Sequence, residues 1–143
     1  MATRRPWHVV PVGWIAVILT GGAALDYLLA RLQIAVWLER VEGGPTAYLA
    51  ALPAWPGLLW PVAVWAGLGG ALCLAAGLRL SAVLLGIAAA AAVVLTLACV
   101  AVREPSVLTA SGPAGASIMI AASTFLVLLW LYARQLHAYG RVP

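Results

Sequence analysis

Four long apolar stretches divide the chain, and most of the polar residues lie in the gaps between them. A helix needs about 20 consecutive apolar residues to cross the hydrocarbon core of a bilayer. The four stretches lie near residues 12–32, 58–78, 82–102 and 116–136. Only a helix satisfies all of its backbone groups within one such segment. The pattern therefore predicts an all-α membrane protein, in which residues 1–143 form one transmembrane domain with a four-helix bundle.

The polar gaps predict how these helices are connected. Helical spacing of leucine and alanine continues from residue 28 to 38, so we expect the first helix to extend beyond the membrane until Gly43-Gly44-Pro45 ends it. Residues 46–52 then predict a short helix on the outer surface. The second helix is expected to open with Pro61 in its first turn. The link 77–81 is so short that the second and third helices must be antiparallel neighbours, whereas the Ser-, Gly- and Pro-rich segment 103–115 predicts a longer loop.

Composition supports a lipid environment, because 65% of the 143 residues are hydrophobic and 8% are charged. Soluble domains carry about 25% charged residues. The net charge of +4 is dispersed over the chain, and nucleic-acid binding needs a concentrated basic surface. The composition therefore argues against a nucleic-acid partner.

The arginines predict the topology of the chain. The two ends and the 77–81 link carry five arginines and no acid, at positions 4, 5, 79, 134 and 141. The opposite side carries three arginines, at positions 31, 40 and 103, together with all four acids. Because cytoplasmic loops are enriched in basic residues, we expect a multi-pass protein of the bacterial inner (plasma) membrane with both termini in the cytoplasm.

Asp26 is the candidate for chemistry, because it lies within the first apolar stretch. Counted from Pro11 at about 1.5 Å per residue, it is roughly two thirds of the way across the membrane. A carboxylate at that depth must be paired or hydrogen-bonded, and it can serve to carry a proton or cation. The structural alternatives are an ion pair with Arg103 or a hydrogen bond to Tyr27 or Thr96.

Aromatic residues near Asp26 suggest a binding site at the outer end of the bundle. The hypothetical site for a substrate or ion consists of Asp26, Tyr27, Trp60 and Trp65. The alternative interpretation is that Tyr48, Trp55 and Trp60 are membrane-boundary anchors, which is the usual role of aromatic residues at such positions.

Small residues recur along the second helix on successive turns. They are Gly67, Gly69, Gly70, Cys73 and Gly77. Such rows allow close helix contact in membranes, so they predict a face that packs inside the bundle or contacts a partner subunit. Cys73 and Cys99 are expected at opposite ends of the antiparallel helices, which excludes a disulfide. His8 and His137 lie at the inner edge with no further ligand at suitable spacing, so no metal or cofactor is expected.

Several short motifs of aromatic, small and polar residues occur along the chain: Asp26-Tyr27, Tyr48, Pro53-x-Trp55, Leu59-Trp60, Val64-Trp65-x-Gly67 and Tyr132-Ala133-Arg134. Together they resemble those of a group of small four-helix bacterial membrane proteins that are often labelled "sugar transporter". The resemblance covers most of the chain, and it implies the same four-helix architecture.

Two functions follow as hypotheses. The first is a non-catalytic accessory or assembly subunit of an inner-membrane complex, whose partners are the lipid bilayer and other membrane subunits or further copies of the chain. The alternative is a small oligomeric transporter, of sugars or cations, that uses Asp26. No Ser-His-Asp set, His-x-x-x-His pair, phosphate-binding glycine loop or acid pair is present in the sequence, and these are motifs on which enzyme chemistry depends. We therefore do not expect an enzyme.

Overall fold

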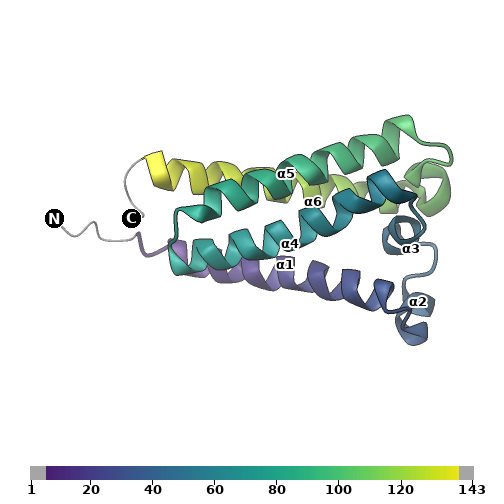
Figure 1. Cartoon of the computed structure of the whole chain (residues 1–143), viewed down its shortest axis with the longest axis horizontal. Coiled ribbons are helices and arrows are strands. Elements are labelled where there is room, and N and C mark those ends of the chain that lie inside the picture. Colours follow the sequence, from purple (N-terminus) through teal and green to yellow (C-terminus); the bar gives the residue numbers. More distant parts are fainter. Residues whose placement is uncertain (1–5, 139–143) are drawn as a thin grey trace.

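A computed structural model describes residues 6–138, and four long helices account for most of that length. The elements in chain order are α1 (Val9–Arg31), α2 (Ala35–Arg40), α3 (Pro45–Ala50), α4 (Ala54–Ala76), α5 (Leu80–Leu97), the single π-helical turn η1 (Ala98–Val102) and α6 (Val107–Ala138). The start of α1 and the end of α6 lie at one end of the bundle, which we call the base (Figure 1). Helices α2 and α3 and the turn η1 lie at the other, which we call the cap end.

The predicted all-α bundle with four membrane-spanning helices is confirmed. Four helices are long and apolar enough to cross a bilayer: Val9–Arg31, Ala54–Ala76, Leu80–Val102 and Val107–Ala138. The predicted short helix in the first connection is also present, as α3. Because a bilayer fixes the length of a spanning helix, hydropathy alone located these segments to within a few turns.

The second spanning helix starts earlier than predicted. Its first residue is Ala54, so Pro61 lies inside α4 and not in its first turn. The proline that occupies the first turn is Pro56, where a missing N–H has no intrahelical partner to lose. The predicted loop 103–115 is also partly wrong, because α6 already begins at Val107. A kink at Gly112, with φ of 67°, separates the first turns of α6 from the rest.

The first helix does not continue past the membrane as predicted. It ends at Arg31, and Gln33 adopts a left-handed conformation with φ of 55°. The N–H of Ile34 then donates to the carbonyl of Leu29 at 3.2 Å, which is the closing hydrogen bond of a Schellman motif. Helix α2 is therefore a separate element that can fold back toward α1.

The spanning helices pack in the order α1, α4, α5, α6 (Figure 1). Helix α4 approaches α1 so closely that a Cβ added at Gly13 would lie 2.7 Å from the Cα of Ala75. The short turn at Gly77, in the left-handed conformation with φ of 74°, makes α4 and α5 antiparallel neighbours, as predicted. Helix α3 contacts α1, α4 and α6 at the cap end.

Candidate functional site

The Asp26 carboxylate joins three helices at the cap end. Its Oδ1 accepts a hydrogen bond from the Trp37 indole Nε1 of α2 at 2.9 Å. Its Oδ2 accepts one from the Thr46 hydroxyl of α3 at 2.8 Å. Asp26 is half-buried and Thr46 is buried. Both carboxylate oxygens are therefore satisfied by neutral donors, and we call these three residues the Asp26 latch.

The latch depends on the break after α1. In a continuous helix Trp37 would lie eleven residues beyond Asp26, which is a rise of about 16 Å. The reversal at Gln33 instead brings the indole within hydrogen-bonding distance. Sequence reasoning missed both donors, because a non-glycine residue at a left-handed position gives no clear signal in a sequence.

The ion pair expected between Asp26 and Arg103 is not formed among the described residues. Arg103 follows η1 in an extended conformation, and its Nε is buried without a hydrogen-bond partner in the part of the chain that the structure describes. Arg103 lies beside Tyr48, whose hydroxyl donates to the carbonyl of Pro105 at 3.0 Å. The reason for the difference is that α2 and α3 already supply two donors to Asp26.

Among residues 6–138, Tyr48 is the group outside the spanning helices whose pKa is shifted. Burial raises the pKa of its hydroxyl above the ordinary value, and the neighbouring Cys99 adds to the rise. The positive charge of Arg103 lowers the pKa and so opposes these effects. Burial is the largest cause, so Tyr48 keeps its proton to a higher pH than a solvated tyrosine does.

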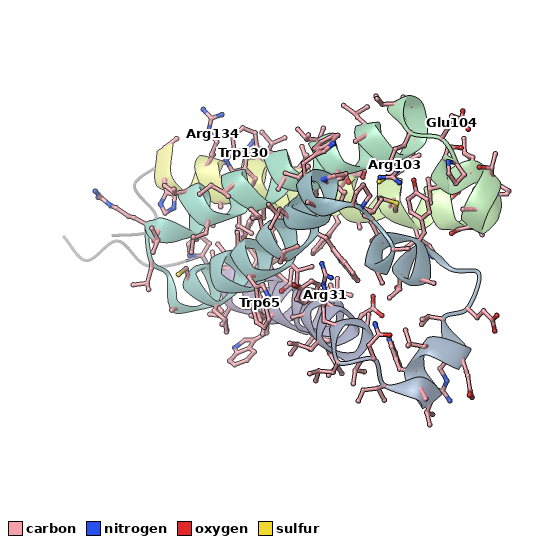
Figure 2. All side chains as sticks on the ribbon, turned by 45° about the vertical axis from the view of Figure 1, so that its right-hand side comes forward. Arg31, Trp65, Arg103, Glu104, Trp130 and Arg134 are labelled. Atoms are coloured by element: carbon pink, nitrogen blue, oxygen red, sulfur yellow. The ribbon has the colours of Figure 1, made fainter. Side chains whose placement is uncertain are left out.

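Three of the four predicted site residues are in contact. The Tyr27 ring meets Trp60 edge-on with centroids 4.9 Å apart and meets Trp65 at 6.4 Å. The Arg31 guanidinium lies over Tyr27, 5.7 Å from its centroid, and Figure 2 shows Arg31 and Trp65 on the α1–α4 side of the bundle. Trp60 is only 5% exposed, so it is an interior residue and the interpretation as a boundary anchor is wrong for it. Asp26 is the fourth predicted site residue, and its hydrogen-bond partners are Trp37 of α2 and Thr46 of α3, not these aromatic rings.

The small residues of α4 are used inside the bundle. Gly67 faces side chains of α1, α5 and α6, and Gly70 lies against Leu85 of α5. Gly77 is buried in the turn, while Gly69 and Cys73 are half-buried. Gly67 and Gly70 therefore serve helix packing, while contact of this face with a partner subunit stays a prediction. Cys73 and Cys99 are both free, so they form no disulfide.

The buried hydroxyl groups of Thr20, Thr96 and Ser123 in the spanning helices are satisfied by close neighbours. Thr96 and Ser123 share a hydrogen bond of 2.7 Å between α5 and α6, and Ser123 donates to the carbonyl of Ala92 at 3.1 Å. The Thr20 hydroxyl donates to the carbonyl of Ala16 at 2.7 Å. Thr96 and Tyr27, the hydrogen-bond partners considered for Asp26, are thus not its partners.

Two histidine contacts fasten the base of the bundle. His8 Nδ1 and the Tyr132 hydroxyl are 2.6 Å apart, which links the start of α1 to the last turns of α6. His137 Nε2 lies 3.2 Å from the Ser81 hydroxyl at the start of α5. Nearby, the Arg134 guanidinium lies 5.0 Å from the Trp130 ring centroid, and both are at the base in Figure 2. In residues 6–138, no group of three His, Cys, Asp or Glu side chains is arranged to hold a metal ion.

Comparisons with known proteins add no family or homologue to this description. No family model, curated protein or solved structure matches the chain.

Proposed function

We propose that the protein is a non-catalytic accessory or assembly subunit of a complex in the bacterial inner membrane. Four apolar spanning helices make it an integral membrane protein. Asp26 has a structural role in this proposal: it holds α2 and α3 against the end of α1. The cap end is then a preformed surface for neighbouring subunits.

The topology in this proposal places the base in the cytoplasm. Arg79 and Arg134 are the basic residues at the described base, and all four acids lie toward the cap end. Because positive residues are retained on the cytoplasmic side, α2 and α3 lie on the outer side. This orientation exposes the latch to the periplasm.

One observation carries the proposal. In the described part of the chain, the buried hydroxyl groups between Asp26 and the base form hydrogen bonds with groups beside them in the bundle. Thr20 bonds to its own helix, and Thr96 and Ser123 bond to each other. A proton or cation path needs polar groups or water along its length. None of these three hydroxyls bonds to Asp26, whose partners are Trp37 and Thr46 at the cap end, and this favours a structural subunit over a transporter.

Purification in a mild detergent, followed by mass analysis of the intact complex, tests this function. We expect the chain to migrate with another membrane protein in fixed stoichiometry. We expect Asp26→Asn to keep that stoichiometry, because the amide weakens the latch but can still bond to Trp37 and Thr46. A chain that always migrates alone as a monomer would contradict the subunit proposal.

Transport of sugars or cations is the second candidate, favoured by the contact of Tyr27 with Trp60 and Trp65 next to Asp26. The resemblance to proteins labelled as sugar transporters points the same way. A transporter reconstituted in vesicles should lose proton-coupled flux when Asp26 is changed to Asn while keeping its oligomeric state. A subunit shows no flux with either side chain.

A further inference from the structure

A groove of about 440 Å³ runs between α1 and α6 on one side of the bundle. Its rims come from α1 and α6, and its floor comes from α4 and α5. The lining includes Leu19 and Ala23 on one rim, Ala122 on the other, and Trp60 and Leu95 on the floor. The groove exists because α1 packs along α4 and α6 packs along α5, while α1 and α6 do not pack along each other.

The groove is closed at both ends and open at its side. At the cap end, helix α3 contacts both α1 and α6, and its Leu49 closes the groove. At the base, the contact of His8 with Tyr132 holds the two helices together. The rim residues Leu19, Ala23 and Ala122 are exposed. Because these rims belong to spanning helices, the opening faces the hydrocarbon core of the bilayer.

The groove is too small to enclose a partner helix. One turn of α-helix, about 10 Å across and 5.4 Å high, fills about 420 Å³. The groove therefore holds about one turn, whereas a spanning helix has more than five. A narrow, flexible chain that enters from the side fits this volume, which is within the range of about 300–1,000 Å³ that small-molecule sites occupy.

The chemistry of the lining excludes a polar occupant. None of the lining residues is charged, and its hydroxyl groups, on Thr20, Thr96 and Ser123, already donate or share hydrogen bonds within the bundle. An apolar cavity without free polar partners does not hold water. In a bilayer, the available apolar chain is the tail of a lipid.

We propose that this groove binds one hydrocarbon tail of a bilayer lipid, with the tail lying between α1 and α6 against Trp60. The tail completes the side of the core that the four helices leave open. This inference goes beyond the proposed function, since a subunit and a transporter would both need the groove filled.

The test compares lipid retention by groove variants of the full-length chain. The protein is purified in detergent, mixed with phosphatidylcholine, washed, and examined by native mass spectrometry. Ala122→Phe and Ala23→Phe fill the groove from opposite rims. Ala121→Phe is the matched control, because Ala121 is exposed on the same helix but does not line the groove. Size-exclusion profiles and circular dichroism establish which variants remain folded, and the two rims provide independent variants.

We expect the native chain and Ala121→Phe to retain one phosphatidylcholine, and each rim variant to retain about tenfold less, because the phenyl ring takes up volume that the tail would occupy. In vesicles of phosphatidylcholine with brominated tails, the bromine atoms should quench the fluorescence of Trp60. This part of the quenching should be absent in Trp60→Phe. Equal retention by all four chains would overturn the proposal. Retention that follows the headgroup, tested with phosphatidylglycerol in place of phosphatidylcholine, would overturn the assignment to a tail. Association with partner subunits is measured separately, so its loss leaves this result intact.

Discussion

The Asp26 latch can be opened by a single isosteric change. In Asp26→Asn the amide oxygen can still accept from the Trp37 indole, and the amide nitrogen can donate to the Thr46 hydroxyl, which accepts as well as donates. Trp37 and Thr46 both donate to the native carboxylate, at 2.9 and 2.8 Å. The variant therefore keeps the shape of the side chain but removes the negative charge that strengthens both bonds.

The expected cost follows from replacing bonds to a charged acceptor with neutral bonds. A hydrogen bond to a charged group contributes about 1.5–3 kcal/mol, and a neutral one contributes about 0.5–1.5 kcal/mol. The difference is about 1 kcal/mol for each bond, and because Asp26 is half-buried we take the total loss as about 1.5 kcal/mol. A loss of about 1.5 kcal/mol corresponds to about a tenfold increase in the population with α2 and α3 detached from α1.

Hydrogen exchange measured by mass spectrometry reports this local opening. In Asp26→Asn the amides of α2 and α3 should exchange about tenfold faster, while those of α4 and α5 remain unchanged, because local openings differ in free energy across a structure. Glu39→Gln is the matched control, since it removes one negative charge from an exposed residue of α2. Trp37→Phe removes one donor, and combined with Asp26→Asn it should cost less than the sum of the two changes. If Asp26→Asn exchanges like the native chain and like Glu39→Gln, the latch does not hold the cap.

Two further changes test the packing and the cap. Gly70→Ala should destabilise the bundle by about 1–3 kcal/mol in SDS unfolding, because its Cβ would lie 2.7 Å from Leu85. Gly69→Ala should be neutral or stabilising, because its Cβ would lie 3.6 Å from its nearest neighbour. Equal effects of the two variants would contradict the packing of α4 against α5. The raised pKa of Tyr48 means that above about pH 10 the folded chain binds more protons than the unfolded one, so stability falls as the pH rises. Thermal unfolding near pH 8 and near pH 11 should show a smaller fall for Tyr48→Phe, and an identical fall would refute this effect.

The fold was predictable because the bilayer imposes one length and one backbone solution on each spanning segment. Helix ends were less predictable. Pro61 looked like a boundary, although α4 begins before it and contains it. A proline is harmless in a first turn but does not itself show where that turn lies.

The candidate site was only partly predictable from the sequence. The depth of Asp26 correctly indicated that the carboxylate needs partners, and the contact of Tyr27 with Trp60 and Trp65 joins residues proposed together. The partners of Asp26 could not be named, because they depend on the chain reversal at Gln33. The groove could not be predicted from the sequence either, because it arises from the separation of α1 and α6, which are distant in sequence.

Cysteine labelling in oriented membrane vesicles tests the central claim, a four-span bundle with its base and cap on opposite sides of the bilayer. Glu42→Cys lies at the cap, while Arg79→Cys and Gln135→Cys lie at the base, and all three positions are exposed. The native cysteines lie within the spans, so the unsubstituted chain is the control for an impermeant maleimide. We predict that Glu42→Cys reacts from the periplasmic side and that the other two react only from the cytoplasmic side. Reaction of Glu42→Cys and Arg79→Cys from the same side would contradict the account.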